Sequence, residues 1–234
     1  METRADDSRK HALRALWLLV PAPTLGALCA FVWAPGAVGQ AVYFVAKLWL
    51  LALPLYWRLR VEGQPLSLSR LAPARRLAGL VVGLVLAASM GGAILGAYAW
   101  LGETWIDLER LREAVRAAGL TERGRFLAFS AYLILINSLA EEYVWRWFCL
   151  RQCSAVMSGR WAIVVSSLFF SLHHAVVFAV QFEARTAALA VCGVFVAGCI
   201  WSACYLRFRS IWPGYLSHVG ADVAGLWIAW ELLF

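Results

Sequence analysis

Long apolar segments recur along the whole chain and constrain its fold more than any other feature. Hydrophobic residues make up 62% of the 234 residues, and a soluble domain of this size could not bury that much apolar surface. Segments of about 20 apolar residues are long enough to cross a hydrocarbon layer of about 30 Å as helices. The sequence therefore predicts an all-α, polytopic transmembrane helical bundle that forms a single integral membrane domain over residues 1–234. We expect about seven spans, with eight as the alternative, at residues 16–35, 38–56, 77–101, 126–150, 161–181, 186–206 and 211–233.

Basic residues are distributed unequally between the connections of the predicted spans. If the N-terminus is cytoplasmic, thirteen Lys and Arg residues fall in cytoplasmic segments and six on the other side. The positive-inside rule therefore predicts a cytoplasmic N-terminus and a C-terminus on the opposite side. The basic connections suit anionic lipid headgroups rather than nucleic acid. The arginine-rich, lysine-poor composition favours the inner (plasma) membrane of a bacterium.

Two connections are long enough to have structure of their own. Residues 57–76 are basic and contain Pro65 and Pro73, which predicts an irregular cytoplasmic loop. Residues 103–118 place apolar side chains on one helical face among mixed charges, and Gly119 follows as a stop signal. We therefore expect an amphipathic helix on the membrane surface there. Close packing of the third span is predicted from the small-residue pairs Gly79/Gly83 and Gly92/Gly96.

Three charged residues lie inside the fourth predicted span. Glu141, Glu142 and Arg146 stand between apolar residues, and one ionised group at membrane depth costs about 2.5–3.5 kcal/mol on insertion scales. Such groups are seldom passive, so we interpret the segment as a functional site within the bilayer. Glu142 and Arg146 lie about 40° apart around a helix, which suits an ion pair. Glu141 faces about 100° away from Glu142 and stays free for chemistry.

Residues in later spans supply candidate partners for Glu141. His173 and His174 lie in the fifth span, and His218 shares one face of the seventh span with Asp222. At about 1.5 Å of rise per residue, the last three of these residues reach a depth similar to that of Glu141. We therefore expect these groups, which come from three separate helices, to meet.

Several of these residues also have a purely structural interpretation. A single intramembrane histidine is often a hydrogen-bonded packing residue, and His173, turned about 100° from His174, either supports the site or packs. Lys47 lies in the middle of the second span without an obvious partner, so we interpret it as a counterion or as a side chain that reaches the membrane surface. The six cysteines form no CxxC pair and are interpreted as small apolar residues rather than disulfide partners or zinc ligands.

Three polar motifs follow one another on successive predicted spans. They are Glu141-Glu142-xxx-Arg146, Phe170-xxx-His174 and His218-xxx-Asp222. Together they resemble the family of CAAX prenyl endopeptidases and bacteriocin-processing proteins, the Abi-type intramembrane proteases. The resemblance covers residues 126–234, where we place the catalytic core, and leaves the first half of the chain family-neutral. Asp222 stands where many members have Asn, and seven spans are one fewer than the eight expected for the eukaryotic prenyl endopeptidase.

The resemblance implies a role for each site residue. The first glutamate of the pair, here Glu141, activates a water molecule, and His174 orients that water or shares its proton. His218 and Asp222 match the positions that polarise the scissile carbonyl and stabilise the oxyanion. Because an ionised aspartate cannot donate a hydrogen bond, we expect Asp222 to hold His218 in its donating tautomer. The expected supporting residues are Glu142, Arg146, His173 and Phe170.

No cofactor is expected from the resemblance, because the glutamate mechanism of the family is independent of metal. The alternative is a zinc ion, since a His and an Asp four residues apart are acceptable ligands and a remaining position can hold water. No HExxH sequence is present. If a metal is bound, the expected ligands are Glu141, His174, His218 and Asp222.

The expected activity is that of an intramembrane endopeptidase of the CAAX protease type. It hydrolyses a peptide bond near the C-terminus, or in a membrane segment, of a substrate protein by glutamate-activated water. The expected partners are this protein or peptide substrate and membrane lipid, and no nucleic acid is expected. For the substrate, a C-terminal sorting or anchor segment is favoured over a prenylated end. The alternatives are a non-catalytic immunity or scaffold protein of the same family, a zinc-dependent protease, and a proton-relaying transporter, which no internal repeat supports.

Overall fold

A computed structural model describes residues 2–69 and 73–234, and within that range every regular element is a helix. The predicted all-α fold is therefore confirmed. Residues 70–72 of the predicted loop, with Arg70 among them, lie outside the described residues, as does Met1. The elements are α1 (Glu2–Leu19), α2 (Pro21–Leu28), η1 (Cys29–Trp33), α3 (Ala37–Tyr56), η2 (Trp57–Val61), α4 (Pro73–Leu101), η3 (Glu103–Trp105), α5 (Leu108–Ala117), α6 (Arg123–Ala131), η4 (Tyr132–Asn137), α7 (Ser138–Glu141), η5 (Glu142–Cys149), α8 (Leu150–Val156), α9 (Gly159–Gln181), α10 (Ala184–Phe208) and α11 (Trp212–Leu233); η3 is a 3₁₀ turn and the other η segments are π-helical.

Six helical segments within the described residues are long and apolar enough to cross a membrane. They overlap the first six predicted spans and confirm that the chain is an integral membrane protein. The seventh predicted span, 211–233, forms the helix α11, but polar residues interrupt its apolar sequence and it is not one of the six. The six segments are Asp6–Trp33, Ala37–Val61, Arg75–Leu101, Arg123–Val156, Gly159–Gln181 and Ala184–Phe208.

The first span begins ten residues earlier than predicted and continues past two prolines. Pro21 and Pro23 lie in the first turn of α2, directly after a break at Val20. Proline is tolerated in the first turn of a helix because the N–H that it lacks would have no partner there. The prolines therefore separate α1 from α2 without ending the span.

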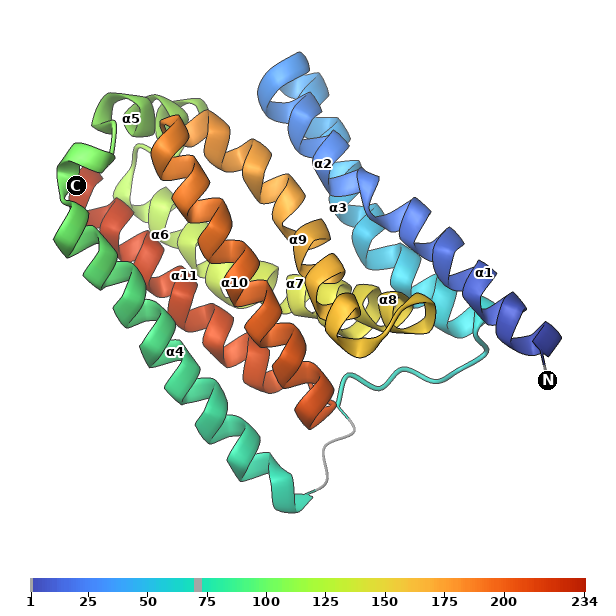
Figure 1. Ribbon diagram of the computed structural model, residues 1–234. Helices are drawn as coiled ribbons and strands as arrows, with labels where there is room; N and C mark the ends of the chain where they lie inside the picture. The colour runs from blue at the N-terminus through green and yellow to red at the C-terminus, as the bar shows by residue number, and fades with distance from the viewer. Residues whose placement is uncertain (1, 70–72) are drawn as a thin grey trace.

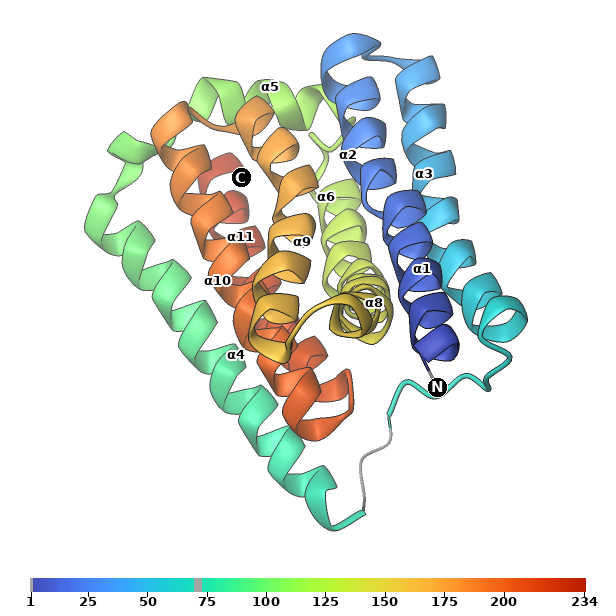
Figure 2. The ribbon, with the colours of Figure 1, turned by 45° about the vertical axis from the view of Figure 1, so that its right-hand side comes forward.

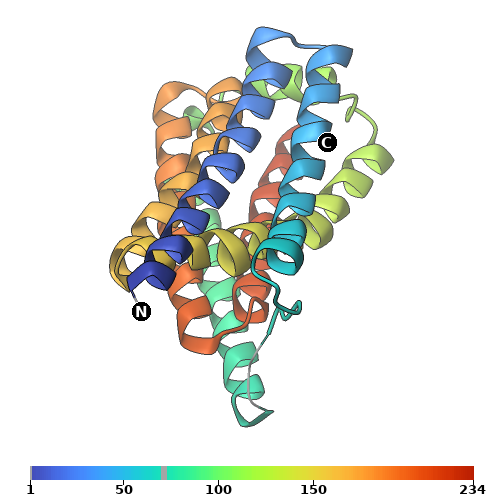
Figure 3. The ribbon, with the colours of Figure 1, turned by 90° about the vertical axis from the view of Figure 1, so that its right-hand side faces the viewer.

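The helices form two groups on either side of α9. The helices α1, α2 and α3 lie together on one side of the molecule, and α4 lies along α11 on the other (Figures 1 and 2). Between them, α9 packs against α10, α8 and α2. The chain from α6 to α8 slopes through the bundle, and α8 contacts α1 (Figure 3). The two ends of the chain lie toward opposite ends of the bundle in all three views.

Small residues allow α4 to approach α11 closely. An added Cβ at Gly83 would lie 2.9 Å from the carbonyl oxygen of Pro213, and one at Gly91 would lie 3.2 Å from a carbonyl oxygen of α11. An added Cβ at Gly92 or Gly96 would meet open space. The predicted close packing is therefore right for Gly83 and wrong for Gly92 and Gly96, because Gly91 faces the neighbouring helix instead.

A short helix, α5, forms within the predicted surface segment 103–118. The side chain of Asp107 caps it by accepting a hydrogen bond from the backbone N–H of Arg110. The guanidinium of Arg110 donates to the last carbonyl oxygens of α9. These hydrogen bonds hold α5 against the C-terminal end of α9.

The carboxylate of Glu62 links the connection after η2 to a neighbouring helix. Glu62 accepts hydrogen bonds from Arg58, from Arg151 and from Gln152. The last two of these residues belong to α8, so Glu62 ties the predicted loop to the segment that carries the paired glutamates.

Candidate active site

The paired carboxylates lie where one long helical segment changes its hydrogen-bonding pattern. The α-helix α6 gives way to π-helical η4, returns for the single turn α7, and changes again at η5. Glu141 ends α7 and Glu142 begins η5. π-Helical turns occur frequently at functional sites. Glu141 is 7% exposed and Glu142 0%, so both carboxylates face the interior of the bundle rather than lipid.

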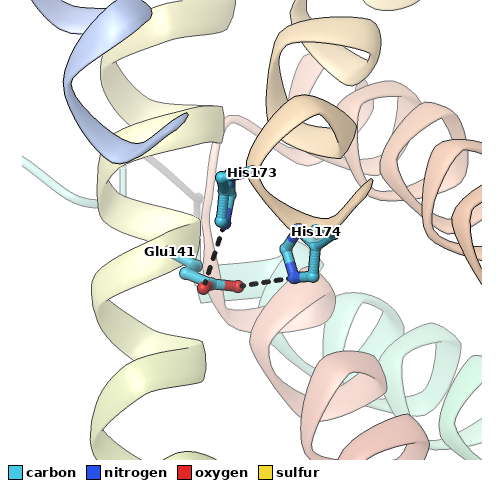
Figure 4. A group of neighbouring side chains, drawn as sticks. All are labelled: Glu141, His173 and His174. Atoms are coloured by element: carbon cyan, nitrogen blue, oxygen red, sulfur yellow. Dashed lines mark ion pairs between the residues drawn. The ribbon is translucent and has the colours of Figure 1, made fainter. Parts of the chain in front are cut away.

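Three histidine rings surround the carboxylate of Glu141. The Nε2 atom of His173 lies 3.8 Å from Oε1, and that of His174 lies 4.0 Å from Oε2; both residues come from α9 (Figure 4). The Nε2 atom of His218, on α11, lies 3.6 Å from Oε2. The structure thus brings Glu141, His174 and His218 together, as their predicted depths required. It also places His173 in contact with the same carboxylate.

One ring nitrogen of His174 is committed to the backbone. Its Nδ1 atom lies 3.0 Å from the carbonyl oxygen of Phe170, and because a carbonyl oxygen only accepts, Nδ1 carries the proton. In the neutral ring, Nε2 is then an acceptor. Oε2 of Glu141 and Nε2 of His174 therefore present two acceptors to each other, and a molecule with two donor hydrogens, such as water, satisfies both.

Glu142 contacts two other site residues at once. Its Oε1 atom lies 3.4 Å from Nε of Arg146 and 3.3 Å from Nδ1 of His218. The predicted ion pair of Glu142 with Arg146 therefore forms, and the same carboxylate also holds His218. Its other oxygen, Oε2, would lie 2.5 Å from a Cβ added at Gly214. A glycine at this position therefore leaves the room that the carboxylate occupies.

The guanidinium of Arg146 is buried between two aromatic rings. Its central carbon lies 4.3 Å from the ring centroid of Phe170 and 5.0 Å from that of Trp201, which is favourable cation–π geometry. Trp201 also stacks on His218, with ring centroids 4.2 Å apart and planes 20° apart. Phe170 thus contacts Arg146 through its ring and His174 through its backbone.

Asp222 approaches His218 from the side of Nε2. Its Oδ1 atom lies 3.9 Å from Nε2, and its Oδ2 atom lies 2.6 Å from the hydroxyl of Ser138. The Nδ1 atom of His218 faces Glu142, so Glu142 keeps a proton on Nδ1, and Nε2 carries a hydrogen only when the ring holds two protons. The expected choice between neutral tautomers by Asp222 therefore gives way to stabilisation of the charged ring, because Asp222 lies on the Nε2 side.

Sequence reasoning missed two polar residues, Asn137 and Ser138, one helical turn before the paired glutamates. Ser138 contacts Asp222, and the side-chain amide of Asn137 donates to Oε1 of Glu141 over 2.9 Å. Lys47 in turn donates to Oδ1 of Asn137 over 2.8 Å. The available signal was the spacing, because Asn137 stands four residues before Glu141 and therefore shares its helical face.

A cavity of about 80 Å³ lies against Glu141. It has room for several water molecules beside the carboxylate. Its lining is mostly apolar, and the polar side chains among the lining residues are Tyr43, Lys47, Tyr132, Asn137, Glu141 and His173.

One group of side chains in the described part of the chain could hold a metal ion. Glu141, His173 and His174 each offer one ligand atom, and these atoms lie within 4.8 Å of one another (Figure 4). This set differs from the expected one, because His173 takes the place of His218 and Asp222. The hydrogen bond from Nδ1 of His174 to a backbone carbonyl is typical of metal-bound histidines. The residues therefore fit a zinc ion.

Comparison with known proteins relates the part of the chain that carries the site to a family. The model of the Rce1-like family, described as type II CAAX prenyl endopeptidase Rce1-like, matches residues 123–224. That segment includes all three polar motifs, so the resemblance predicted from them is confirmed. No match was found among curated proteins or among solved structures.

Proposed function

We propose that the protein is an intramembrane peptidase in which Glu141 activates water. The match of residues 123–224 to the model of the Rce1-like family of type II CAAX prenyl endopeptidases supports this proposal. One observation carries the proposal. A buried carboxylate in a membrane-spanning segment has the Nε2 atoms of three histidines within 4.0 Å. Carboxylate and imidazole groups in contact are the usual means of general acid–base catalysis.

The proposed nucleophile is a water molecule between Glu141 and His174. Its two hydrogens point to Oε2 of Glu141 and to Nε2 of His174, which leaves an oxygen lone pair for the carbon of the scissile carbonyl. As the new O–C bond forms, Glu141 takes one proton from the water. When the C–N bond breaks, that proton passes to the leaving amine, so hydrolysis needs no covalent enzyme intermediate.

His218 is proposed to stabilise the negative charge that develops on the carbonyl oxygen. Because its Nδ1 donates to Glu142, its Nε2 donates only when the ring is an imidazolium. The carboxylates of Glu141, Glu142 and Asp222 lie within 3.9 Å of the ring nitrogens and complement that positive charge. An oxyanion donor of this kind typically contributes about 10²–10³ in rate.

Asp222 is proposed to support His218 by charge rather than by donating a hydrogen bond. Ser138 holds one of its oxygens, which leaves the other facing Nε2 of His218. An asparagine in the same place would keep the contact with Ser138 and could also donate directly to an oxyanion. This difference between the two residues makes the position a useful test.

The proposed substrate is a protein or peptide whose scissile bond lies near its C-terminus or in a membrane segment. The description of the family names a CAAX prenyl endopeptidase. The cavity beside Glu141 is mostly apolar, and this supports a hydrophobic C-terminal segment, with a sorting or anchor segment favoured over a prenylated end.

The proposed location is the inner membrane of a bacterium, with the N-terminus in the cytoplasm. The distribution of basic residues favours this orientation. Because the two chain ends lie toward opposite ends of the bundle (Figure 1), the C-terminus is proposed to lie on the other side of the membrane.

Cleavage assays in liposomes test the proposed function. The purified protein is incubated with synthetic peptides that end in an apolar segment, with and without a prenylated cysteine, and products are identified by mass spectrometry. We expect the wild type to cleave one class of peptide and Glu141→Ala to cleave none, while its apparent melting temperature stays unchanged. Glu113→Ala, which removes an exposed carboxylate of α5, is the matched control. No cleavage by the wild type, or equal cleavage by Glu141→Ala, would overturn the proposal.

A zinc-dependent peptidase at the same place is the second candidate. The convergence of Glu141, His173 and His174 favours it. A metal ion held there would polarise the scissile carbonyl or activate water. Metal analysis of the purified protein separates the two candidates.

A further inference from the structure

Glu141 receives a hydrogen bond from a residue that belongs to none of the three motifs. The amide of Asn137 donates to Oε1 of Glu141 over 2.9 Å, and the ammonium of Lys47 donates to Oδ1 of Asn137 over 2.8 Å. An ammonium only donates and a carboxylate only accepts, so the orientation of the amide between them is determined. We propose that Lys47 and Asn137 are positioning residues that hold Glu141 for catalysis, an inference that rests on the proposed peptidase function.

Lys47 brings the first half of the chain into the site. It lies on α3, outside the segment that matches the family, and it reaches a residue 90 positions away in the sequence. The contact of α3 with η5 holds the two segments together. The N-terminal helices therefore supply a polar group to the base as well as covering the bundle.

The charge of Lys47 is costly where it stands. The residue is half-buried in the membrane-spanning segment Ala37–Val61, and a charge at membrane depth typically has a functional role. Across residues 2–69 and 73–234, no carboxylate forms an ion pair with its ammonium within 4.0 Å. Its neighbours are the amide of Asn137 and the ring of Tyr43, whose centroid lies 5.5 Å away. Lys47 was expected to be a counterion or to reach the membrane surface. It donates a hydrogen bond instead to Asn137, which in turn donates to Glu141.

The hydrogen bond from Asn137 distinguishes the two oxygens of Glu141. Oε1 is held by Asn137, whereas Oε2 faces His174 and His218. Without Asn137 the carboxylate can turn about its last bond, and the water bound to it turns as well. Small errors in the position of a reacting group cost much of the rate. Loss of the hydrogen bond from Asn137 should therefore lower the rate of the chemical step and leave the affinity for substrate unchanged.

Steady-state kinetics of five variants test the proposal, with the peptide that the wild type cleaves best in the liposome assay. Lys47→Met and Asn137→Leu should each lower kcat by about 10- to 100-fold, as expected for loss of a hydrogen bond to a charged group, with KM unchanged. The double variant should be no worse than Asn137→Leu alone, because the two residues act through one path. Lys47→Arg, which keeps a donor, should restore most of kcat. Gln40→Leu, two turns earlier on α3 and exposed, is the control.

Three outcomes would overturn the positioning role while leaving the peptidase function intact. Unchanged kcat in Lys47→Met would show that the lysine is structural. A raised KM with unchanged kcat would show that it binds substrate. Additive effects in the double variant would show that the two residues act separately. No cleavage by the wild type is distinct from these, because it would overturn the proposed function and the positioning role together.

Discussion

Removing Glu142 should separate the stability of the protein from its activity. Glu142 is 0% exposed and faces both Arg146 and His218. Glu142→Leu leaves the guanidinium of Arg146, itself 1% exposed, without a carboxylate, and it also removes the partner of Nδ1 of His218. Adding Arg146→Met removes the unpaired charge but leaves His218 without that partner.

The magnitudes follow from these contacts. Breaking a buried ion pair typically costs about 3–5 kcal/mol, which corresponds to a fall of roughly 6–20 °C in melting temperature for a chain of this size. Replacing both members of such a pair by apolar residues is often neutral, and methionine packs well against aromatic rings such as those of Phe170 and Trp201. We therefore expect the double variant to regain most of the lost stability. Activity should fall by about 10²–10³ in both variants, because the imidazolium of His218, which donates to the oxyanion, loses a carboxylate that stabilises its charge.

Two measurements in matched detergent and lipid decide the matter. Thermal melting followed by tryptophan fluorescence gives the apparent stability, and peptide cleavage in liposomes gives the activity. A double variant as unstable as Glu142→Leu would show that the unpaired charge of Arg146 is not the source of the loss. Recovery of activity in the double variant would show that Glu142 has no part in positioning His218.

Three further predictions concern the oxyanion site and the metal. Asp222→Asn should keep its rate within about tenfold of the wild type while His218→Ala loses about 10²–10³; a folded but inactive Asp222→Asn would contradict the role assigned to this position. Gly214→Ala should lower kcat, because the added Cβ displaces the carboxylate of Glu142; an unchanged kcat would show that this displacement does not reach His218. Prolonged chelation should leave the rate unchanged, and metal analysis should find far less than one equivalent of transition metal. Stoichiometric zinc, with activity lost to the chelator and restored by zinc, would favour the metal-dependent candidate.

The helices were predictable because a helix that crosses lipid needs about 20 consecutive apolar residues, and such segments can be recognised in a single sequence. The π-helical turns η4 and η5 were not predictable, because their hydrogen-bond register depends on packing against other helices. The same holds for α4, where Gly91 rather than Gly92 faces α11. These neighbours point about 100° apart on a helix, and the spacing of small residues alone did not determine which one meets the partner.

The charged part of the site was predictable because each polar group at membrane depth is costly and therefore conspicuous. Asn137 was missed because an uncharged amide in an apolar run is a weak signal. The hydrogen bond of Lys47 depends on how α3 lies against η4 and η5, which no local pattern reveals. The second contact of Glu142, with Nδ1 of His218, likewise depends on the rotation of α11.

A single-turnover cleavage in oxygen-18 water tests the central claim, that Glu141 activates water for direct attack on the peptide bond. Enzyme in excess cleaves the reporter peptide once, and mass spectrometry reads the new carboxyl group of the N-terminal product. Direct attack predicts one oxygen-18 atom in that carboxyl group in the first turnover, and no product with Glu141→Gln. A first-turnover product without oxygen-18 would contradict the account, because its oxygen would have come from the carboxylate of the enzyme through a covalent intermediate.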